Sequence, residues 1–352
     1  KIENEEVKRR HHNKNILITG GAGSIGSEIV RQVALFEPAL IVVLDQAETP
    51  LYEIEMEMRN LFPMISFKFV LGDISNKHRI EPLFQKHQFS VVYHAAAYKH
   101  VPLIEENPHE AVLVNILGTK NLSTLASQYK VNRFVMVSTD KAVKPTNVMG
   151  ASKRAAELFV QALQNTDNNT TKYITTRFGN VLGSNGSVIP HFKRQIENGG
   201  PVTITHPDIT RYFMTIPEAC DLVLQAGAMG KGGEIFVFDM GEPVKIVDLA
   251  KRMIKLSGLE PEIDIKIIYT GLRPGEKLYE ELLSDDATTM PTHHEKIMIS
   301  KDSAMEYQEI EKFCNHISKS ALRGEKVEVV RILKEIVPEF KSNNSIYEVL
   351  DK

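Results

Sequence analysis

The sequence has few cysteines, little net charge and no long apolar run. Its two cysteines, Cys220 and Cys314, lie far apart and lack the spacing of metal ligands, which predicts buried thiols in a reducing compartment, with neither a disulfide framework nor a metal site. A formal net charge of −3 gives no general attraction for nucleic acid or anionic lipid. The apolar runs, such as residues 39–44, are only as long as strands, so no membrane span or secretory signal is predicted within these residues.

The composition of the 352 residues, 42% hydrophobic and 25% charged, is that of a globular protein with one large or two moderate cores. From residue 15 onward, short apolar runs alternate with helical patterns. This alternation predicts an α/β fold, a doubly wound parallel sheet of the Rossmann type with a smaller substrate-binding lobe. We predict a polar linker at 1–13, a dinucleotide-binding domain at 14–180 with 215–240, a substrate-binding lobe at 181–214 with 241–300, and a C-terminal helical segment at 301–352.

A glycine-rich loop follows the first predicted strand, residues 16–19. Glycines at positions 20, 23 and 26 allow a tight turn, close approach of a pyrophosphate to the backbone, and packing of the next helix on the sheet. The strand at 40–44 ends in Asp45, 19 residues beyond Gly26, where a carboxylate accepts hydrogen bonds from an adenosine ribose. No basic residue follows Asp45 in the stretch Gln46-Ala47-Glu48, so the sequence favours NAD over NADP.

Acidic and small residues follow two further strands. Asp73 comes just after the strand at 67–71, and it either reaches the adenine amino group or caps the next helix. The strand at 90–93 leads into Ala95–Ala97, whose small side chains let the backbone lie against a flat cofactor. Both segments are therefore candidates for contact with a dinucleotide.

Three polar residues come next in the chain. Lys99 and His100 lie beyond the alanine run, where they face either a substrate or only solvent. Asn115 lies among apolar neighbours in the following helix, so its side chain needs a polar partner.

An acid and an amine stand side by side after the strand at 133–137, in Ser138-Thr139-Asp140-Lys141. A helix begins soon afterwards, near Met149, and the next strand ends in residues 177–180. In open α/β sheets, ligands bind outside the carboxyl ends of the strands, so all these segments converge on one edge. We therefore place the chemistry at Asp140 and Lys141.

Several longer motifs give the chain between about Asn15 and Ser300 a family resemblance. It resembles an extended short-chain dehydrogenase/reductase, and more closely the sugar-nucleotide 4,6-dehydratases of bacterial polysaccharide and glycan synthesis, the CapD, WbpM and PglF type. The motifs are the glycine loop, HAAAYKHVP at 94–102, STDK at 138–141, RFGNVLGSNGSVIP at 177–190, PDITRYFMTIP at 207–217 and RPGEK at 273–277.

The resemblance implies UDP-N-acetylglucosamine as substrate, a tightly held nicotinamide cofactor and a 4-keto-6-deoxy product. It also implies an amino-terminal membrane region in the full-length protein, with this part at the cytoplasmic face of the membrane, and we expect a homo-oligomer. The cofactor-binding residues it implies are Gly20, Gly23, Ser24, Ile25, Gly26, Asp45, Glu48, Asp73, Ile74, Ala95, Ala96, Ala97, Asn115, Lys153 and Phe178. The substrate-binding residues are Lys99, His100, Asn180, Ser187, Val188, Thr203, Arg211, Met214, Arg273 and Glu276.

Within the second group, the resemblance assigns parts of the nucleotide to particular side chains. Asn180, Arg211 and Arg273 are candidates for the diphosphate, because guanidinium groups match phosphate oxygens. Glu276 is a candidate for the uridine ribose. The nucleotide slot would be lined by Thr203, Ser187 and Val188.

One position departs from the superfamily pattern Tyr-x-x-x-Lys. Met149 stands in the place of the tyrosine, whereas Lys153 is retained. A thioether cannot take up the proton that the phenol removes from a substrate hydroxyl. Methionine here resembles the longer membrane-anchored dehydratases that retain configuration at C5, so retention is favoured over inversion.

The mechanism we hypothesise uses the remaining polar groups. Once C4 is oxidised, the C5 hydrogen is acidic, and neutral Lys141 removes it; burial, Lys153 and the nicotinamide cation are expected to lower the Lys141 pKa. Asp140 collects the C4 hydroxyl proton, directly or through Thr139 or water, and donates it to the departing C6 hydroxyl. Lys153 holds the nicotinamide ribose.

Three alternatives stay open at this point. A C5-inverting dehydratase shares the reaction, and a UDP-sugar 4-epimerase shares its first oxidation but needs no acid for a leaving hydroxyl. A non-catalytic NAD-binding scaffold would bind the dinucleotide and turn over no UDP-sugar.

Overall fold

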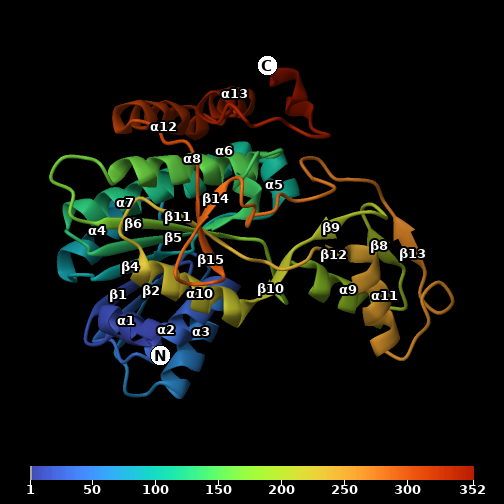
Figure 1. The fold of residues 1–352 in the computed structure, drawn as a ribbon, viewed down its shortest axis with the longest axis horizontal. Helices are drawn as coiled ribbons and strands as arrows, with labels where there is room; N and C mark the ends of the chain where they lie inside the picture. The colour runs from blue at the N-terminus through green and yellow to red at the C-terminus, as the bar shows by residue number, and fades with distance from the viewer. Residues whose placement is uncertain (1) are drawn as a thin grey trace.

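A computed structural model describes residues 2–352, which are arranged around a nine-stranded sheet with helices on both faces (Figure 1). The strand order is β14-β15-β11-β6-β5-β4-β1-β2-β3. Neighbours from β3 to β11 pair in parallel, and β15 and β14 add an antiparallel edge. The strands are β1 Asn15–Thr19, β2 Leu40–Asp45, β3 Phe67–Leu71, β4 Val91–His94, β5 Arg133–Thr139, β6 Lys172–Phe178, β11 Ile235–Phe238, β14 Thr289–Pro291 and β15 Ile297–Ser300. The predicted doubly wound sheet is confirmed.

Strands β2, β4 and β11 are mostly apolar because both faces of the sheet are covered. In β1, Leu17 belongs to the core on one face, whereas Ile16 and Ile18 belong to the core on the other. The first face carries α4 Lys77–Lys86, α5 Val101–Glu106, α6 Pro108–Ala111, the π-helix η1 Val112–Gly118, α7 Thr119–Gln128 and α8 Val148–Leu163. The second carries α1 Ile2–His11, α2 Ser24–Ala34, α3 Glu48–Leu61 and α10 Ile216–Met229.

Residues 2–11 are helical, so the linker predicted at 1–13 is wrong for these residues; residue 1 lies outside the described part of the chain. Helix α1 packs on α10, with Val7 only 2% exposed. His11 is buried as well, and its Nε2 lies 2.6 Å from the hydroxyl of Tyr93 in β4. The helix is polar on average, and these two contacts, which its composition does not reveal, fix it to the domain.

A smaller lobe lies at one end of the sheet and has its own apolar core, which includes Phe192, Ile204 and Ile254 (Figure 1). Its elements are α9 Val188–Glu197, β8 Val202–Ile204, β9 Thr210–Arg211, β12 Val244–Lys245, α11 Ile246–Leu256 and β13 Ile267–Tyr269. Strand β7 Asn180–Leu182 pairs with β10 Phe213–Thr215 between the lobe and the sheet.

The predicted end of this lobe at residue 300 is wrong. Strands β14 and β15 lie in the range assigned to the lobe but belong to the main sheet. Beyond them, the predicted C-terminal helices are present as α12 Tyr307–Leu322 and α13 Lys326–Ile336, followed by the short 3-10 helix η3 Ile346–Leu350. Helices α12 and α13 pack on the outer side of α8 (Figure 1), which explains why 15 of its 16 residues are buried.

Across residues 2–352, no helix combines the length and the apolar character needed to cross a membrane. In the same part of the chain, no group of three or more His, Cys, Asp or Glu side chains is arranged to hold a metal ion.

Candidate active site

A pocket opens at the carboxyl ends of β1 to β4. From β1, the strands β2 and β3 follow on one side and β4 and β5 on the other, so the direction of the strand order reverses at this point. Such a reversal is the usual place for a dinucleotide in an open α/β sheet. The pocket brings together most of the residues predicted to bind the cofactor. Its lining consists of Gly20, Gly23, Leu44, Asp45, Gln46, Gly72, Asp73, Ile74, Ala95, Ala96, Ala97 and Val114.

Two glycines of the loop occupy places where a side chain would not fit. Gly20 has a φ of +66°, and a Cβ there would lie 2.6 Å from the backbone nitrogen of Ala96. A Cβ on Gly26 would lie 2.0 Å from the carbonyl oxygen of Gly20. The loop therefore packs directly against the Ala95–Ala97 segment and the start of α2, as close approach of a pyrophosphate to the backbone requires.

Asp45 is held at the edge of this pocket by the glycine loop itself. Its Oδ2 accepts a hydrogen bond from the Ala22 backbone nitrogen at 3.0 Å, and its Oδ1 accepts one from Ala47 at 2.9 Å. None of the described residues that line the pocket carries a positive charge. A 2′-phosphate would meet the Asp45 carboxylate, and no cation is among the described lining residues, which favours NAD.

Other predicted cofactor residues do not line the pocket. The Asn115 side chain is fully buried and bonds the backbone N–H and C=O of Tyr98 and the hydroxyl of Ser152, so it holds the segment after the alanine run in place. Phe178 stacks on Phe238, with ring centroids 5.7 Å apart. Four more lie along the start of their helices: Ser24, Ile25, Gly26 and Glu48.

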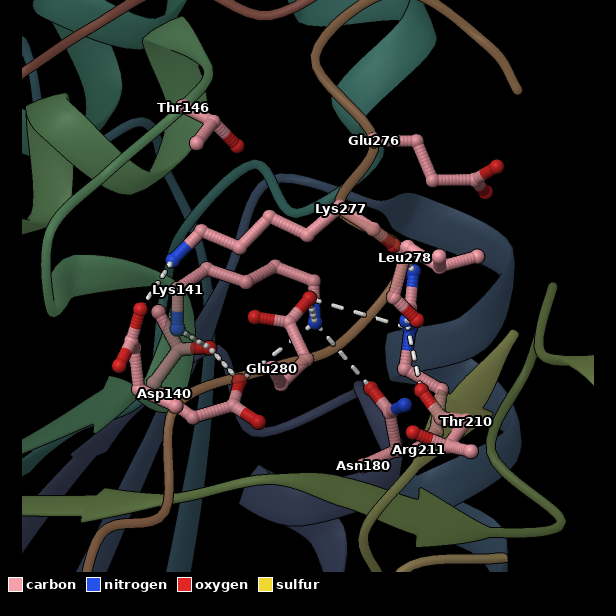
Figure 2. A network of polar contacts seen from close by, with 12 residues as sticks. Asp140, Lys141, Thr146, Asn180, Thr210, Arg211, Glu276, Lys277, Leu278 and Glu280 are labelled. Carbon is pink, nitrogen blue, oxygen red and sulfur yellow. Dashed lines mark hydrogen bonds and ion pairs between the residues drawn. The ribbon is translucent and has the colours of Figure 1, made fainter. Parts of the chain in front are cut away.

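The predicted acid and amine lie at the end of β5, where the short 3-10 helix η2 Asp140–Ala142 begins. The Lys141 amine is 3.5 Å from Asp140 Oδ1 and donates to Asn180 Oδ1 at 3.3 Å (Figure 2). Thr139 donates its hydroxyl proton to Asp140 Oδ1 at 3.2 Å. Asp140 is 1% exposed, and its Oδ2 has no hydrogen-bond partner among the described residues. This arrangement leaves one buried carboxyl oxygen without a partner among the described residues.

The charges around the pair set the direction of both pKa shifts. Burial raises the pKa of Asp140, against the opposing pull of the Lys141 charge. Burial also lowers the pKa of Lys141, but the carboxylates of Asp140 and Glu280 outweigh it and hold that pKa above its usual value. The expectation that the Lys141 pKa is lowered is therefore wrong for the protein without ligands, because the charges of Asp140 and then Glu280 outweigh the effect of burial.

Glu280 is the site residue that sequence reasoning missed. Its side chain is 2% exposed, and its Oε1 lies 3.8 Å from the Lys141 amine and 3.8 Å from Arg211 Nε (Figure 2). In the sequence it shows only as an acidic residue three positions past the RPGEK motif, between Tyr279 and Glu281. That signal does not distinguish it from its neighbour Glu281.

Helix α8 brings Met149 and Lys153 beside the same strand end. Asn147 caps the helix by accepting a hydrogen bond from the Gly150 nitrogen at 2.7 Å. Met149 is 4% exposed and belongs to the apolar core, which agrees with its inability to exchange a proton. The Lys153 amine donates to the Val137 carbonyl at 2.8 Å, and burial lowers its pKa to about 8.

The two arginines predicted for a diphosphate have different surroundings. Arg211 donates from both terminal nitrogens to the main-chain carbonyls of Thr210, Lys277 and Leu278, which fixes its guanidinium group in the lobe; its contact with a diphosphate stays a prediction. The Arg273 side chain is 59% exposed and pairs with Glu276 at 3.0 Å. Of the two, Arg273 has the more exposed charge.

The remaining predicted substrate residues lie on the segment after β4, in the lobe and on β10. His100 lies against Gly186, where an added Cβ would be 2.6 Å from the imidazole ring. Burial lowers the pKa of Lys99 and that of His100. Ser187 and Val188 begin α9, Thr203 of β8 accepts a hydrogen bond from Gln195 of α9, and Met214 is buried on β10.

The sequence is similar to proteins that are named for polysaccharide synthesis or for reactions of UDP-sugars. It is 57% identical over 296 residues to "Capsular polysaccharide biosynthesis protein CapD" of Staphylococcus aureus, which covers 84% of this chain and 49% of the relative, so the chain spans about half the length of that protein. It is 37% identical to "UDP-N-acetylglucosamine 4,6-dehydratase (inverting)" of Campylobacter jejuni and to "UDP-glucose 4-epimerase" of Rickettsia canadensis, each over 78% of both chains.

The fold is shared with solved structures of similar enzymes. The X-ray structure of Pen from Bacillus thuringiensis is 32% identical and has a TM-score of 0.76, with 88% of this chain and 98% of that chain covered. The structure of the dTDP-glucose 4,6-dehydratase DesIV from Streptomyces venezuelae, with NAD bound, is 23% identical and has a TM-score of 0.66, with 76% and 88% covered. The polysaccharide biosynthesis protein family matches residues 16–302, and this chain belongs to that family.

Proposed function

We propose that this chain is the catalytic part of an NAD-dependent UDP-N-acetylglucosamine 4,6-dehydratase of bacterial polysaccharide or glycan synthesis, with retention of configuration at C5. The observation that carries the proposal is the buried Asp140–Lys141 pair, with a carboxyl oxygen left unpartnered and Met149 in the place of a phenol. Oxidation and reduction alone would not require an acid beside an amine; removal of a hydroxyl group does.

The pocket at the carboxyl ends of β1 to β4 fits a nicotinamide dinucleotide. The glycine loop offers a backbone surface on which side chains are excluded at Gly20 and Gly26, and Asp45 is positioned for a ribose. When bound, NAD supplies an acceptor for the C4 hydride and a donor that returns it at C6. Lys153, with an amine whose pKa is about 8, would hold the ribose next to the nicotinamide.

Asp140 carries one proton from the start of the reaction to the departure of water. Its Oδ2 accepts the proton of the C4 hydroxyl as that carbon is oxidised, directly or through Thr139, which already bonds Oδ1. The same carboxyl then donates this proton to the C6 hydroxyl, which leaves as water. Burial raises the Asp140 pKa, so the carboxyl takes up the proton more readily than an exposed aspartate would.

Lys141 handles the second proton. Its neutral amine removes the hydrogen at C5, which the C4 ketone has made acidic, and the resulting ammonium returns a proton to C5 after the hydroxyl has left. Asn180 accepts a hydrogen bond from the amine and so orients it. Because one group removes and returns the proton on the same face, the configuration at C5 is retained.

A 4-epimerase is the competing function, and the similarity to an enzyme of that name favours it as the second candidate. It would use the same first oxidation, but Asp140 would have no leaving group to protonate. For the full-length protein, we propose a location at the cytoplasmic face of the membrane and assembly as a homo-oligomer.

The test is to incubate the purified chain with NAD and UDP-N-acetylglucosamine and to follow the products by mass spectrometry and proton NMR. Dehydration yields a product lighter by one water, with a new methyl signal from C6 and a configuration at C5 that NMR couplings report. A product of unchanged mass with inverted C4 would establish the epimerase instead. Bound NAD without any turnover of UDP-sugars would contradict both enzymes and favour a scaffold.

A further inference from the structure

Glu280 lies where the chain passes from the lobe back to the main sheet, between β13 and β14. Its carboxyl group is 2% exposed, and Oε1 stands 3.8 Å from both the Lys141 amine and Arg211 Nε. Its second oxygen, Oε2, is buried without a hydrogen-bond partner among the described residues. A buried carboxyl that faces the reactive amine and has few other partners is poorly explained by packing alone.

The segment around Glu280 is held from both sides. Arg211 donates to the carbonyls of Lys277 and Leu278, three and two residues before Glu280. The Lys277 amine donates to the Val143 carbonyl at 3.2 Å, just beyond η2 (Figure 2). These contacts fix Glu280 relative to the end of β5, even though the two segments come from distant parts of the chain.

We propose that Glu280 is a positioning residue that places the Lys141 amine at the mouth of β5 and governs its protonation, an inference that rests on the proposed dehydratase function. The groups facing the amine are Asp140, Glu280 and Arg211, with Tyr212 beyond Asp140. Burial and the bound nicotinamide cation weaken the amine as a base, and the Glu280 charge opposes both. Asp140 and Glu280 together hold the pKa of the amine above its usual value, so loss of the Glu280 charge should lower that pKa.

Protonation of Lys141 is measured without turnover, by labelling its amine with trace acetic anhydride across a range of pH and quantifying the labelled peptide. Glu280→Gln removes a negative charge 3.8 Å from the amine, so the midpoint of labelling is expected to fall by about one pH unit or more. Glu281→Gln is the matched control, because Glu281 pairs with Lys277 and is 37% exposed; its midpoint should equal the wild type. A midpoint unchanged in folded Glu280→Gln protein would overturn the proposal.

The second measurement is the turnover rate, kcat, of the Glu280 variants. Glu280 raises the pKa of Asp140 as well as that of Lys141, so both limbs of the kcat–pH profile should move to lower pH in Glu280→Gln. Glu280→Asp keeps the charge and shortens the reach: its labelling midpoint should stay within about half a unit of the wild type, while kcat falls about tenfold. A wild-type kcat in that variant would exclude a positioning role. Because labelling requires no substrate, it tests Glu280 even if the chain fails to dehydrate UDP-N-acetylglucosamine.

Discussion

Lys141 is the residue whose removal should separate binding from chemistry. Lys141→Ala removes the proposed base but leaves the glycine loop and Asp45 intact, so NAD and UDP-sugar should still bind. Exchange of solvent deuterium into C5 should be abolished, as measured by mass spectrometry in deuterated water. Lys144→Ala, three residues away at an exposed position, is the control. Labelling of C5 at the wild-type rate in Lys141→Ala would refute the assignment of the base.

Asp140→Asn keeps the shape of the side chain and removes its ability to donate a proton to the leaving hydroxyl. We expect kcat to fall by about 10²–10⁴-fold, the usual contribution of general acid catalysis, with a small change in KM. Steady-state kinetics with UDP-N-acetylglucosamine provide the measurement. A kcat within about threefold of the wild type would mean that the C6 hydroxyl obtains its proton elsewhere.

The sequence was sufficient to group Asp140, Lys141 and Asn180, because all three follow neighbouring parallel strands and such strand ends meet at one edge. It was insufficient for Arg211 and Glu280. Whether a guanidinium group is free or bound to main-chain carbonyls depends on how a distant segment passes over it, and Arg211 meets residues 277 and 278 only in three dimensions. The same contact decides that Glu280, rather than Glu281, faces the amine.

Among the elements, helices and strands with a clear period were predictable, and the element with a weak period was not. The strands predicted at 40–44 and 67–71 occur as β2 and β3, and the helix predicted to begin near Met149 occurs as α8. Helix α1 has no broad apolar face, and it is held by Val7 and the buried imidazole of His11. A single histidine among polar residues gives no sign in the sequence that it will be buried.

His11 makes the attachment of α1 sensitive to pH. Burial lowers its pKa to about 4, below the usual value of 6.5, so on acidification the unfolded chain binds a proton before the folded chain does. Its contribution is therefore lost as pH falls below about 6.5, by about 1.4 kcal/mol between about pH 7.5 and about pH 5.5. In His11→Gln, the free energy of unfolding measured with urea should therefore fall less between these two pH values, by about 1.4 kcal/mol, than in the wild type. His12→Gln, the neighbouring and more exposed position, should leave this fall unchanged.

At the level of the whole molecule, the alternation of strands and helices fixed the sheet but not its boundaries. Strands β14 and β15 are short, antiparallel and separated by a turn, so they resemble loop sequence until β11 provides a partner. Pairing with a distant strand determines that they belong to the sheet and not to the lobe. The division of the chain at residue 300 could not be predicted for this reason.

The C-terminal helices form a further layer over α8, the helix that carries Met149 and Lys153. Leu333 of α13 is fully buried in the core shared with α8, so Leu333→Ala should leave a cavity and lower the free energy of unfolding by about 2–5 kcal/mol. Leu322→Ala, at a position 72% exposed at the end of α12, should change it by less than about 0.5 kcal/mol. Urea unfolding measures both variants. Leu333 lies on α13 and not at the strand ends that carry Asp140 and Lys141, so kcat of the folded Leu333→Ala enzyme at 25 °C should equal the wild type. A loss of stability below about 1 kcal/mol would show that the outer layer is not part of the same core.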